Sequence, residues 1–435
     1  SKGYMVIIQD VRGMGSSEGV FNGFSQEASD TSETHEWVRS LKECNGKLGL
    51  YGFSYQGFTQ LTGELNSKPP DCLSPAMTGM NIKDHWCSDG GAYWWHNNIA
   101  WGLQIAALKM KRENNLFEWE KIRLALENKS YLREGIDILK KYDPNSFVLE
   151  WLKNLNNARP FEEFKPISTW IKQPMLIIGG LWDPHLKGAF DLYKKSKEAG
   201  GSPEIIIGNA THLNWWEGSQ ESLLKFFDKH LKSDEKFNSK NLKDEKKIWN
   251  ISLNKWEELD NKFNPEFIFG LKSDGTANVE VEDGSLTINS KGSGWFTIVN
   301  DPWRPTPSDG GHLGPNPGKF NRSIIDKRLD VGVFQTNSFE EDQYLRGVPT
   351  LEIQVKSDQP NFDICLALSL VEEGNEKVNQ FSTGFLRVKN SKISEECIYQ
   401  ITMQPTNICL IKDSKLRLSI SAAAYPAIGV NPGFG

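Results

Sequence analysis

The sequence predicts an α/β domain that is interrupted by a helical block and followed by an all-β domain. Short apolar runs alternate with helical stretches over residues 1–80 and 166–235, and this order is typical of a parallel sheet covered by helices. Residues 81–165 are aromatic and helical, with weak strand signals. From residue 248 to 435, strand-length runs are separated by Gly, Asn, Asp and Pro, with no helices between them. That pattern predicts a sandwich or jelly roll.

Apolar runs and turn residues predict the individual elements of the α/β domain. Before the helical block we expect strands and helices at Tyr4–Gln9, Ser25–Leu41, Leu48–Phe53 and Gly57–Leu65, in alternation. After it the alternation resumes at Trp170–Gly179, Leu186–Ala199, Glu204–Gly208 and Gln220–Leu231. The helical block at 81–165 is therefore expected to be a cap inserted between two parts of one sheet.

A charged stretch, Lys232–Lys247, is expected to be an exposed connector to the all-β domain. The strands predicted beyond it are four to seven residues long and have turn residues on both sides. They are Glu266–Leu271, Ser285–Ile288, Gly294–Ile298, Thr350–Val355, Ile364–Leu370, Gly384–Val388, Ile398–Met403 and Lys415–Ser421.

Composition excludes several classes of protein. The chain has 435 residues, of which 38% are apolar and 24% charged, as expected for two or three globular domains. It has no apolar run of about 18 residues, so we expect no membrane partner. The net charge of −6 is spread without a basic block, so we expect no nucleic-acid partner. Six cysteines without close pairs predict free thiols, which favours a cytoplasmic location, and no zinc site. Assembly into a homo-oligomer stays open.

A serine lies at a predicted strand-to-helix turn in the segment GFSYQG, residues 52–57. Gly52 precedes Ser54 by two residues, whereas Gly57 follows it by three instead of the usual two of a Gly-x-Ser-x-Gly motif. A tight turn of this kind exposes a strained nucleophile. The helix that follows presents the Tyr55 N–H to a developing oxyanion. Because Gly-x-Ser turns are common, the motif alone leaves an inert turn open.

An acid and a histidine follow two later strands, in that order. Asp183 comes after the apolar run at 174–180, and His212 comes after the strand at 204–208. The order Ser, acid, His is that of α/β-hydrolases. An Asp before Pro is often only a turn residue, but both groups at successive strand ends favour a triad with Ser54. We expect His212 to take the serine proton and Asp183 to orient the imidazole.

Further motifs along the chain form a set with these segments. The set comprises GYMVIIQDVRG at 3–13, SEG at 17–19, GLYGFSYQG at 49–57, GLWDP at 180–184, GNATH at 208–212, DPWRPTP at 301–307 and GG at 310–311. As a set the motifs resemble the CocE/NonD hydrolases. This group includes cocaine esterase, α-amino-acid ester hydrolases, β-lactam acylases and the X-Pro dipeptidyl-peptidases of family S15. The group's own Ser-Tyr-x-Gly spacing explains the displaced second glycine.

The resemblance implies an α/β-hydrolase core with an inserted helical cap and a C-terminal jelly roll that closes one side of the site. It assigns the triad to Ser54, Asp183 and His212, and it implies that neither a metal nor an organic cofactor is needed. It also implies strands before residue 1, including a loop with a tyrosine that supplies a second oxyanion donor, and closing strands after residue 435. We therefore expect the chain to be part of a longer protein.

Four residues are candidates for the substrate pocket. Fifteen tryptophans occur in the chain, clustered at 86–101, 151–182 and 215–216. Trp86 and Trp101 resemble two cap tryptophans that contact the acyl group in cocaine esterase, although ordinary packing within the cap explains them equally well. Trp182 and His185 flank the acid. His185 stands where cocaine esterase has an aromatic residue, which argues against the same benzoyl specificity.

The sequence therefore predicts a serine hydrolase that cleaves a small ester or an amide through an acyl-enzyme, as an esterase or acylase. The first alternative is an X-Pro dipeptidyl-peptidase acting on peptides, which needs acidic residues that hold a free α-amine. Asp84, Asp89 and Glu113 are candidates for that role. The second alternative is an inactive hydrolase-like protein that binds carbohydrate or protein through its all-β domain.

Overall fold

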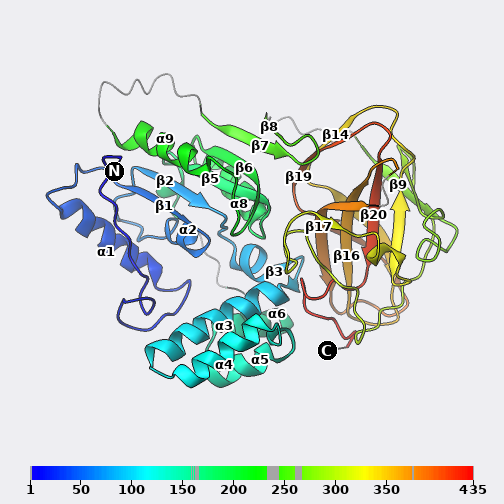
Figure 1. Cartoon of the computed structure of the whole chain (residues 1–435), viewed down its shortest axis with the longest axis horizontal. Helices are drawn as coiled ribbons and strands as arrows, with labels where there is room; N and C mark the ends of the chain where they lie inside the picture. The colour runs from blue at the N-terminus through cyan, green and yellow to red at the C-terminus, as the bar shows by residue number, and fades with distance from the viewer. Residues whose placement is uncertain are drawn as a thin grey trace.

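The structure is a computed structural model of the chain. It describes residues 2–434 except 158, 160, 162–165, 233–243, 260–266 and 375–376. Most of the connector expected at Lys232–Lys247, and the first residue of the strand expected at Glu266–Leu271, lie outside the described residues. In Figure 1 the first sheet and its helices lie on the left, a layer of helices below it, and the β-rich part on the right.

Among the described residues the first sheet has six strands, in the order β1-β2-β5-β6-β7-β8. Neighbours from β1 to β7 pair in parallel, and β8 returns antiparallel to β7. Parallel neighbours require long crossover connections, which helices and the helical layer supply here. The strands are Gly49–Phe53 (β1), Cys72–Ala76 (β2), Leu176–Trp182 (β5), Glu204–Thr211 (β6), Lys246–Asn250 (β7) and Lys255–Glu258 (β8).

Helices cover both faces of this sheet. Successive residues of a strand point to opposite faces, so Ile178 shares a buried cluster with Phe226 of α9 (Ser219–Leu231), whereas Ile177 shares one with residues of α8 (Leu186–Glu198). Every residue of β2 and β5 is buried. Burial on two sides explains why β5 is an unbroken apolar run.

The helical layer lies between β2 and β5 in the chain and has its own core. Ile99, Leu103, Leu139 and Val148 are fully buried in it. A short π-helix and a hairpin lead into this layer from the sheet. These elements are η1 (Lys83–Cys87), β3 (Ser88–Asp89), β4 (Ala92–Tyr93), α3 (Trp95–Arg112), α4 (Leu116–Glu127), α5 (Tyr131–Tyr142) and α6 (Phe147–Asn156).

The described residues of the β-rich part form an eight-stranded sheet and two ribbons, β14-β19 and β15-β18. The order in the large sheet is β11-β9-β10-β13-β20-β16-β17-β12. Its strands are Phe269–Ser273 (β9), Ser285–Ile288 (β10), Ser293–Gly294 (β11), Phe320–Asn321 (β12), Val331–Gln335 (β13), Phe362–Val371 (β16), Val378–Val388 (β17) and Lys415–Ser421 (β20). The ribbons are Gln343–Gly347 (β14) with Thr406–Leu410 (β19), and Thr350–Lys356 (β15) with Glu396–Thr402 (β18). The predicted fold class, an α/β domain with a helical insertion followed by a β-rich domain, is confirmed.

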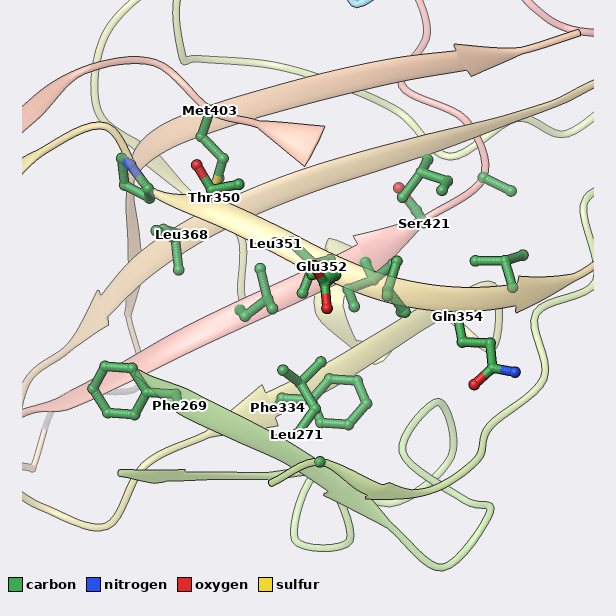
Figure 2. Close-up of a pocket in the computed structure, with 18 of the residues that line it drawn as sticks. Phe269, Leu271, Phe334, Thr350, Leu351, Glu352, Gln354, Leu368, Met403 and Ser421 are labelled. Atoms are coloured by element: carbon green, nitrogen blue, oxygen red, sulfur yellow. The ribbon is translucent and has the colours of Figure 1, made fainter. Parts of the chain in front are cut away.

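A large, partly open pocket lies in the β-rich part and reaches Phe190 of α8 and Ile248 of β7. Its volume is about 2810 Å³, and Figure 2 shows Leu271, Phe334 and Leu368 of the large sheet beside Leu351 of β15 around it. Side chains of two facing sheets normally fill the roughly 10 Å between them. Here the described covering layer consists of narrow ribbons, which leave part of the large sheet's apolar face uncovered.

The segment at 425–427, which follows β20, docks on the start of α3 and on α5. The N–H groups of Trp95 and His96 donate to the carbonyl oxygens of Ala427 (3.1 Å) and Pro426 (3.0 Å), and the Tyr425 hydroxyl donates to the Leu132 carbonyl (3.0 Å). The first N–H groups of a helix have no acceptor within the helix. The β-rich part therefore supplies the N-terminal cap of a helix in the neighbouring layer.

The prediction of a strand at Tyr4–Gln9 is wrong. These residues form no strand, and Val6 and Ile8 are exposed by 60% and 86%. Tyr4 donates a hydrogen bond to Asp228 on α9 (2.5 Å), and Thr34 of α1 (Glu27–Ser40) donates to Gln9 (2.9 Å). An apolar run becomes a strand only when a neighbour pairs with it, and among the described residues β1 pairs with β2 alone.

Other predicted elements differ in extent. The helix expected at Gly57–Leu65 is α2, Tyr55–Thr59, and the start of the strand expected at Trp170–Gly179 belongs to α7, Ser168–Ile171. The strand expected at Gly294–Ile298 is absent from the described structure beyond the short β11. The first sheet continues through β7 and β8, so the β-domain boundary expected at residue 248 falls inside that sheet. Among the described helices, none has both the length and the apolar character needed to cross a bilayer.

Candidate active site

Ser54 lies at the turn between β1 and α2, in a strained backbone conformation. Its φ and ψ are 59° and −128°, a region that residues with a side chain rarely occupy. The Ser54 N–H donates to the Ala76 carbonyl at the end of β2 (2.9 Å), and the Ser54 carbonyl accepts from Gly57 and Phe58 (2.9 and 3.0 Å). These bonds hold the turn so that the hydroxyl stands at the carboxyl end of the sheet.

Two glycines allow this turn to form. Gly52 has φ +153°, and a Cβ there would lie 2.7 Å from the Gln56 Cβ. A Cβ on Gly57 would lie 2.9 Å from the Ala76 carbonyl oxygen. Gln56, which occupies the usual place of the second glycine, is exposed. The close approach to β2 falls one residue later than in the usual motif, which explains physically why Gly is needed at 57 and not at 56.

Gln60 supports the turn, and the sequence offered no signal for it. Its side chain is buried and donates to the carbonyl oxygens of Gly52 and Gln56 (both 3.1 Å) and Ser74 (3.3 Å). Its Oε1 accepts from the Ser74 N–H (3.1 Å). One amide therefore ties the turn at Ser54 to the neighbouring strand β2.

The structure brings Ser54, Asp183 and His212 into one chain of hydrogen bonds. His212 Nε2 lies 2.9 Å from Ser54 Oγ, and His212 Nδ1 lies 2.5 Å from Asp183 Oδ2. Asp183 follows β5, and His212 follows β6. Because β1, β5 and β6 are parallel members of one sheet, their carboxyl ends meet at one edge. Residues far apart in the sequence therefore come into contact there.

Burial and pairing determine the charges of Asp183 and His212. Asp183 is fully buried, which alone would raise its pKa, but the neighbouring His212 lowers that pKa below the ordinary value. Burial alone would lower the pKa of His212, but Asp183 raises it above 6.5. The remaining oxygen of Asp183 accepts from the His185 N–H (2.8 Å). Both carboxylate oxygens are thus satisfied.

The predicted pocket residues fall into two groups. His185, Trp86 and Trp101 form a row of rings next to His212, with centroid distances of 5.3 Å (His212 to His185), 4.3 Å (His185 to Trp86) and 5.8 Å (Trp86 to Trp101). Trp182 instead lies in the core of the sheet, where its indole N–H donates to Asn209 (2.7 Å). Trp86 is itself buried and belongs to the core of the helical layer.

The Tyr55 side chain is held through its hydroxyl. Its hydroxyl donates to the Glu27 carboxylate and accepts from the Phe24 N–H (2.8 Å). Its backbone N–H is the first of α2 and therefore has no acceptor within the helix. Within the described residues, no group of three or more His, Cys, Asp or Glu side chains is arranged to hold a metal ion.

Two family models match the two halves of the chain. The X-Pro dipeptidyl-peptidase (S15 family) model covers residues 1–214, and the X-Pro dipeptidyl-peptidase C-terminal non-catalytic domain covers residues 239–435. The chain belongs to the S15 hydrolase family. This S15 protein is a serine hydrolase of the esterase or X-Pro dipeptidyl-peptidase type, and the predicted kinship with the CocE/NonD group is confirmed.

Cocaine esterase from Rhodococcus sp. (strain MB1 Bresler) is similar to the S15 hydrolase over its full length. The two are 22% identical over 484 residues, which span 100% of this chain and 83% of the relative. Solved structures share the fold at lower identity. An aminopeptidase from a marine sediment archaeon (Thaumarchaeota archaeon) has a TM-score of 0.70 at 18% identity, with 98% of this chain and 79% of that chain covered. An α-amino acid ester hydrolase has a TM-score of 0.68 at 18% identity, with the same coverage.

The acidic residues considered for holding a substrate amine are placed differently in the S15 hydrolase. Asp84 is exposed and accepts from the Asn81 side chain (2.9 Å), and Glu113 is exposed at the end of α3. Asp89 is buried and already paired with Lys187 (2.7 Å). None of the three carboxylates is both close to Ser54 in the described contacts and free of a protein partner.

Proposed function

We propose that the protein hydrolyses an ester or amide bond through an acyl-enzyme on Ser54. The observation that carries this proposal is the continuous chain from Ser54 Oγ through His212 to Asp183, with distances of 2.9 and 2.5 Å. A serine hydroxyl becomes an effective nucleophile when an oriented base accepts its proton. A neutral imidazole with Nδ1–H bound to a buried carboxylate presents Nε2 as that base.

In this mechanism the Ser54 proton passes to His212 Nε2 while Oγ bonds to the acyl carbon. The carbonyl oxygen becomes an oxyanion, and the Tyr55 N–H at the start of α2 is positioned to donate to it. His212 then gives the proton to the leaving alcohol or amine as that bond breaks. A water molecule repeats the sequence on the acyl-enzyme, with His212 again as base, and releases the acid and Ser54.

A fluorophosphonate probe tests this proposal, because it reacts with an activated serine. We expect the wild-type protein to be labelled at Ser54, identified by peptide mass spectrometry, and Ser54→Ala to remain unlabelled. His212→Ala should reduce labelling strongly while circular dichroism shows a folded protein. A folded wild-type protein that the probe leaves untouched would refute the proposed nucleophile.

X-Pro dipeptidyl-peptidase activity is the second candidate, because both matching family models carry that description. The pairing of Asp89 favours the esterase or acylase function, since its carboxylate is already balanced by Lys187 and hydrogen-bonded to His312 within the protein. Parallel assays with Gly-Pro-p-nitroanilide and short p-nitrophenyl esters separate the two functions. A higher kcat/KM for the anilide would assign the peptidase function instead.

A further inference from the structure

A network of four side chains, three of them buried, connects the hydrolase sheet to the β-rich part. At its centre is Asp89 of β3, whose Oδ1 accepts from Lys187 Nζ (2.7 Å) and whose Oδ2 lies 3.1 Å from His312 Nε2. The other nitrogen of His312, Nδ1, lies 2.8 Å from the Thr383 hydroxyl. Asp89 and His312 are 5% and 3% exposed. Groups buried this deeply are retained at a cost in desolvation and call for a role.

The charges in this network are fixed by its partners. Burial alone would raise the pKa of Asp89, but Lys187 and His312 lower it to about 2. Burial lowers the pKa of His312 below its ordinary value despite the attraction of Asp89. His312 is therefore neutral near pH 7. Since a carboxylate can only accept, Nε2–H donates to Asp89 and Nδ1 accepts from the Thr383 hydroxyl.

The network reaches the segment that carries Asp183. Lys187 lies in the first turn of α8, four residues after Asp183 and two after His185. His185 makes two further bonds: its N–H donates to Asp183 within the segment 183–187 (2.8 Å), and its Nδ1–H ties the segment to the His85 carbonyl of η1 (2.6 Å). Lys187 and His185 thus anchor the acid-bearing segment to the stretch of η1 and β3.

The β-rich part contacts the turn between β3 and β4 and so holds the stretch of η1 and β3 in place. The Arg387 N–H of β17 donates to the Gly90 carbonyl (2.9 Å), and a Cβ on Gly90 would lie 2.0 Å from the Phe385 carbonyl oxygen. The glycine permits this close contact between the β3–β4 turn and β17. Figure 1 shows β3 where the sheet, the helical layer and the β-rich part meet. His312 is the residue of the β-rich part that completes the contact with Asp89.

We propose that His312 and Asp89 are positioning residues through which the β-rich part holds the Asp183 segment, and with it the Asp183–His212 hydrogen bond, in working geometry. The inference rests on the proposed role of Ser54, Asp183 and His212. Neither positioning residue contacts the reacting atoms. Their effect passes from His312 to Asp89, from Asp89 to Lys187, and along the first turn of α8 to Asp183.

The test compares His312→Ala and Asp89→Asn with wild-type protein. We expect kcat for a p-nitrophenyl ester to fall by roughly 10- to 100-fold with little change in KM, because a small displacement of a catalytic group costs about that much in rate. In these variants Asp183 is held less firmly and stabilises the charged His212 less, so the pKa of His212 should be lower than in the wild-type protein. The fall of kcat/KM at acidic pH should therefore occur at a lower pH. His312→Gln, which keeps an N–H for Asp89, should recover most of kcat.

Asp326→Asn is the matched control, because it disturbs another buried ion network of the β-rich part, around Arg322 and Arg417. It should lower stability and leave kcat and the acidic limb unchanged. An equal loss of kcat in this control would overturn the proposal, and so would folded His312→Ala and Asp89→Asn proteins with wild-type kcat and pH profile. If those two variants fail to fold, Lys187→Met, at the partly exposed end of the network, must show the same shift of the acidic limb.

A readout independent of turnover separates this inference from the proposed function. The His212 Nδ1 proton bound to Asp183 is expected as a low-field signal in proton NMR. The signal should be present in the wild-type protein and weakened or lost in His312→Ala and Lys187→Met. If the fluorophosphonate probe leaves the wild-type protein unlabelled but the NMR signal still depends on His312 and Lys187, Ser54 is not the nucleophile and the positioning network stands. An active wild-type protein whose signal is unaffected in both variants refutes the network.

Discussion

Asp183 is the most constrained side chain of the proposed triad. It is completely buried, one oxygen accepts from the His185 N–H, and the other binds His212 Nδ1. The tautomer of His212 depends on this second bond, because the ring can present a lone pair at Nε2 only if Nδ1 carries the proton. The carboxylate therefore acts on Ser54 entirely through the imidazole.

Asp183→Asn should lower kcat by about 10⁴-fold, because an amide can hold the ring in the tautomer whose Nε2 carries a proton. KM should change little, since the buried carboxyl is out of reach of substrate. Steady-state kinetics on a p-nitrophenyl ester measure both constants. Fluorophosphonate labelling should slow in parallel, and an Asn variant with kcat within tenfold of wild type would contradict the assigned role.

The pH dependence of kcat/KM should report the raised pKa of His212. The base works only when neutral, so activity should be full at high pH and fall as the pH drops through that pKa. We expect the midpoint of the acidic limb above 6.5. The profile is measured on an ester that does not itself titrate between pH 5 and 9. A midpoint below 6.5 in the wild-type protein would show that Asp183 does not stabilise the charged ring.

The sequence pointed to Ser54, Asp183 and His212, which hydrogen bonds connect in the structure, because each follows a strand end and their order along the chain matches a known pattern. Gln60 carries no such signal, since a polar residue in a short helix is usually exposed. The contact between Asp89 and His312 spans 223 residues, and neither side chain has a local motif. Contacts of that kind depend on how the sheet, the helical layer and the β-rich part pack against one another. The local residue pattern carries no information on that packing.

The turn from β1 to α2 packs tightly against the end of β2. β1 and β2 lie in register from Gly49 with Cys72 to Phe53 with Ala76, and α2 starts directly after Ser54. The helix consequently crosses the end of β2 at contact distance. The backbone of Gly57 fills the space against Ala76, and no side chain can be added there without movement.

Gly57→Ala should destabilise the protein by about 1–3 kcal/mol, the usual penalty for overpacking, because its Cβ would lie 2.9 Å from both the Ala76 oxygen and the Thr78 Cβ. The displacement should also slow fluorophosphonate labelling of Ser54. Urea unfolding and labelling rates measure the two effects. Gln56→Ala, one residue away and exposed, should change the unfolding midpoint very little; equal midpoints for the two variants would contradict the packing argument.

Strands were predicted well at β6 and β16, where a buried apolar run begins and ends close to the predicted bounds. The strand β2, Cys72–Ala76, was missed although all of its residues are buried, because its five residues include Ser and Pro. Tyr4–Gln9 is an apolar run like those of β6 and β16 but lies outside the described sheet, so the pattern alone was misleading. The ribbon strand β14 was missed because its burial alternates between exposed and half-buried positions, with Arg346 and Gln343 among its residues. Pairing with β19, 59 or more residues away, makes it a strand.

At the scale of the whole molecule, the β-rich part is stabilised by its own buried ionic network. Asp326 accepts from Arg322 (3.2 Å) and the Ser419 hydroxyl (2.9 Å), and Arg417 lies 3.5 Å away. Arg322 also donates to Gln380 (3.0 Å). A buried guanidinium is tolerated only while its counter-charge is present. The network joins the segment before β13 to strands β17 and β20.

Asp326→Asn should reduce the free energy of unfolding by roughly 3–5 kcal/mol, because it leaves the buried Arg322 without its counter-charge. Chemical denaturation followed by tryptophan fluorescence measures the loss. Asp137→Asn, which removes an exposed partner of Lys140, is the matched control and should leave the curve unchanged. Coincident curves for Asp326→Asn and wild type would show that the network contributes little.

The distance along the chain between His212 and His312 has a consequence for synthesis. All three members of the proposed triad have been made once the ribosome passes residue 212, but the partner that anchors Asp89 comes about a hundred residues later. At typical elongation rates of about 5–20 residues per second, this interval lasts on the order of 5–20 s. During it the nascent chain carries the proposed nucleophile without the proposed support for Asp183, so full hydrolytic competence should emerge only as the β-rich part folds.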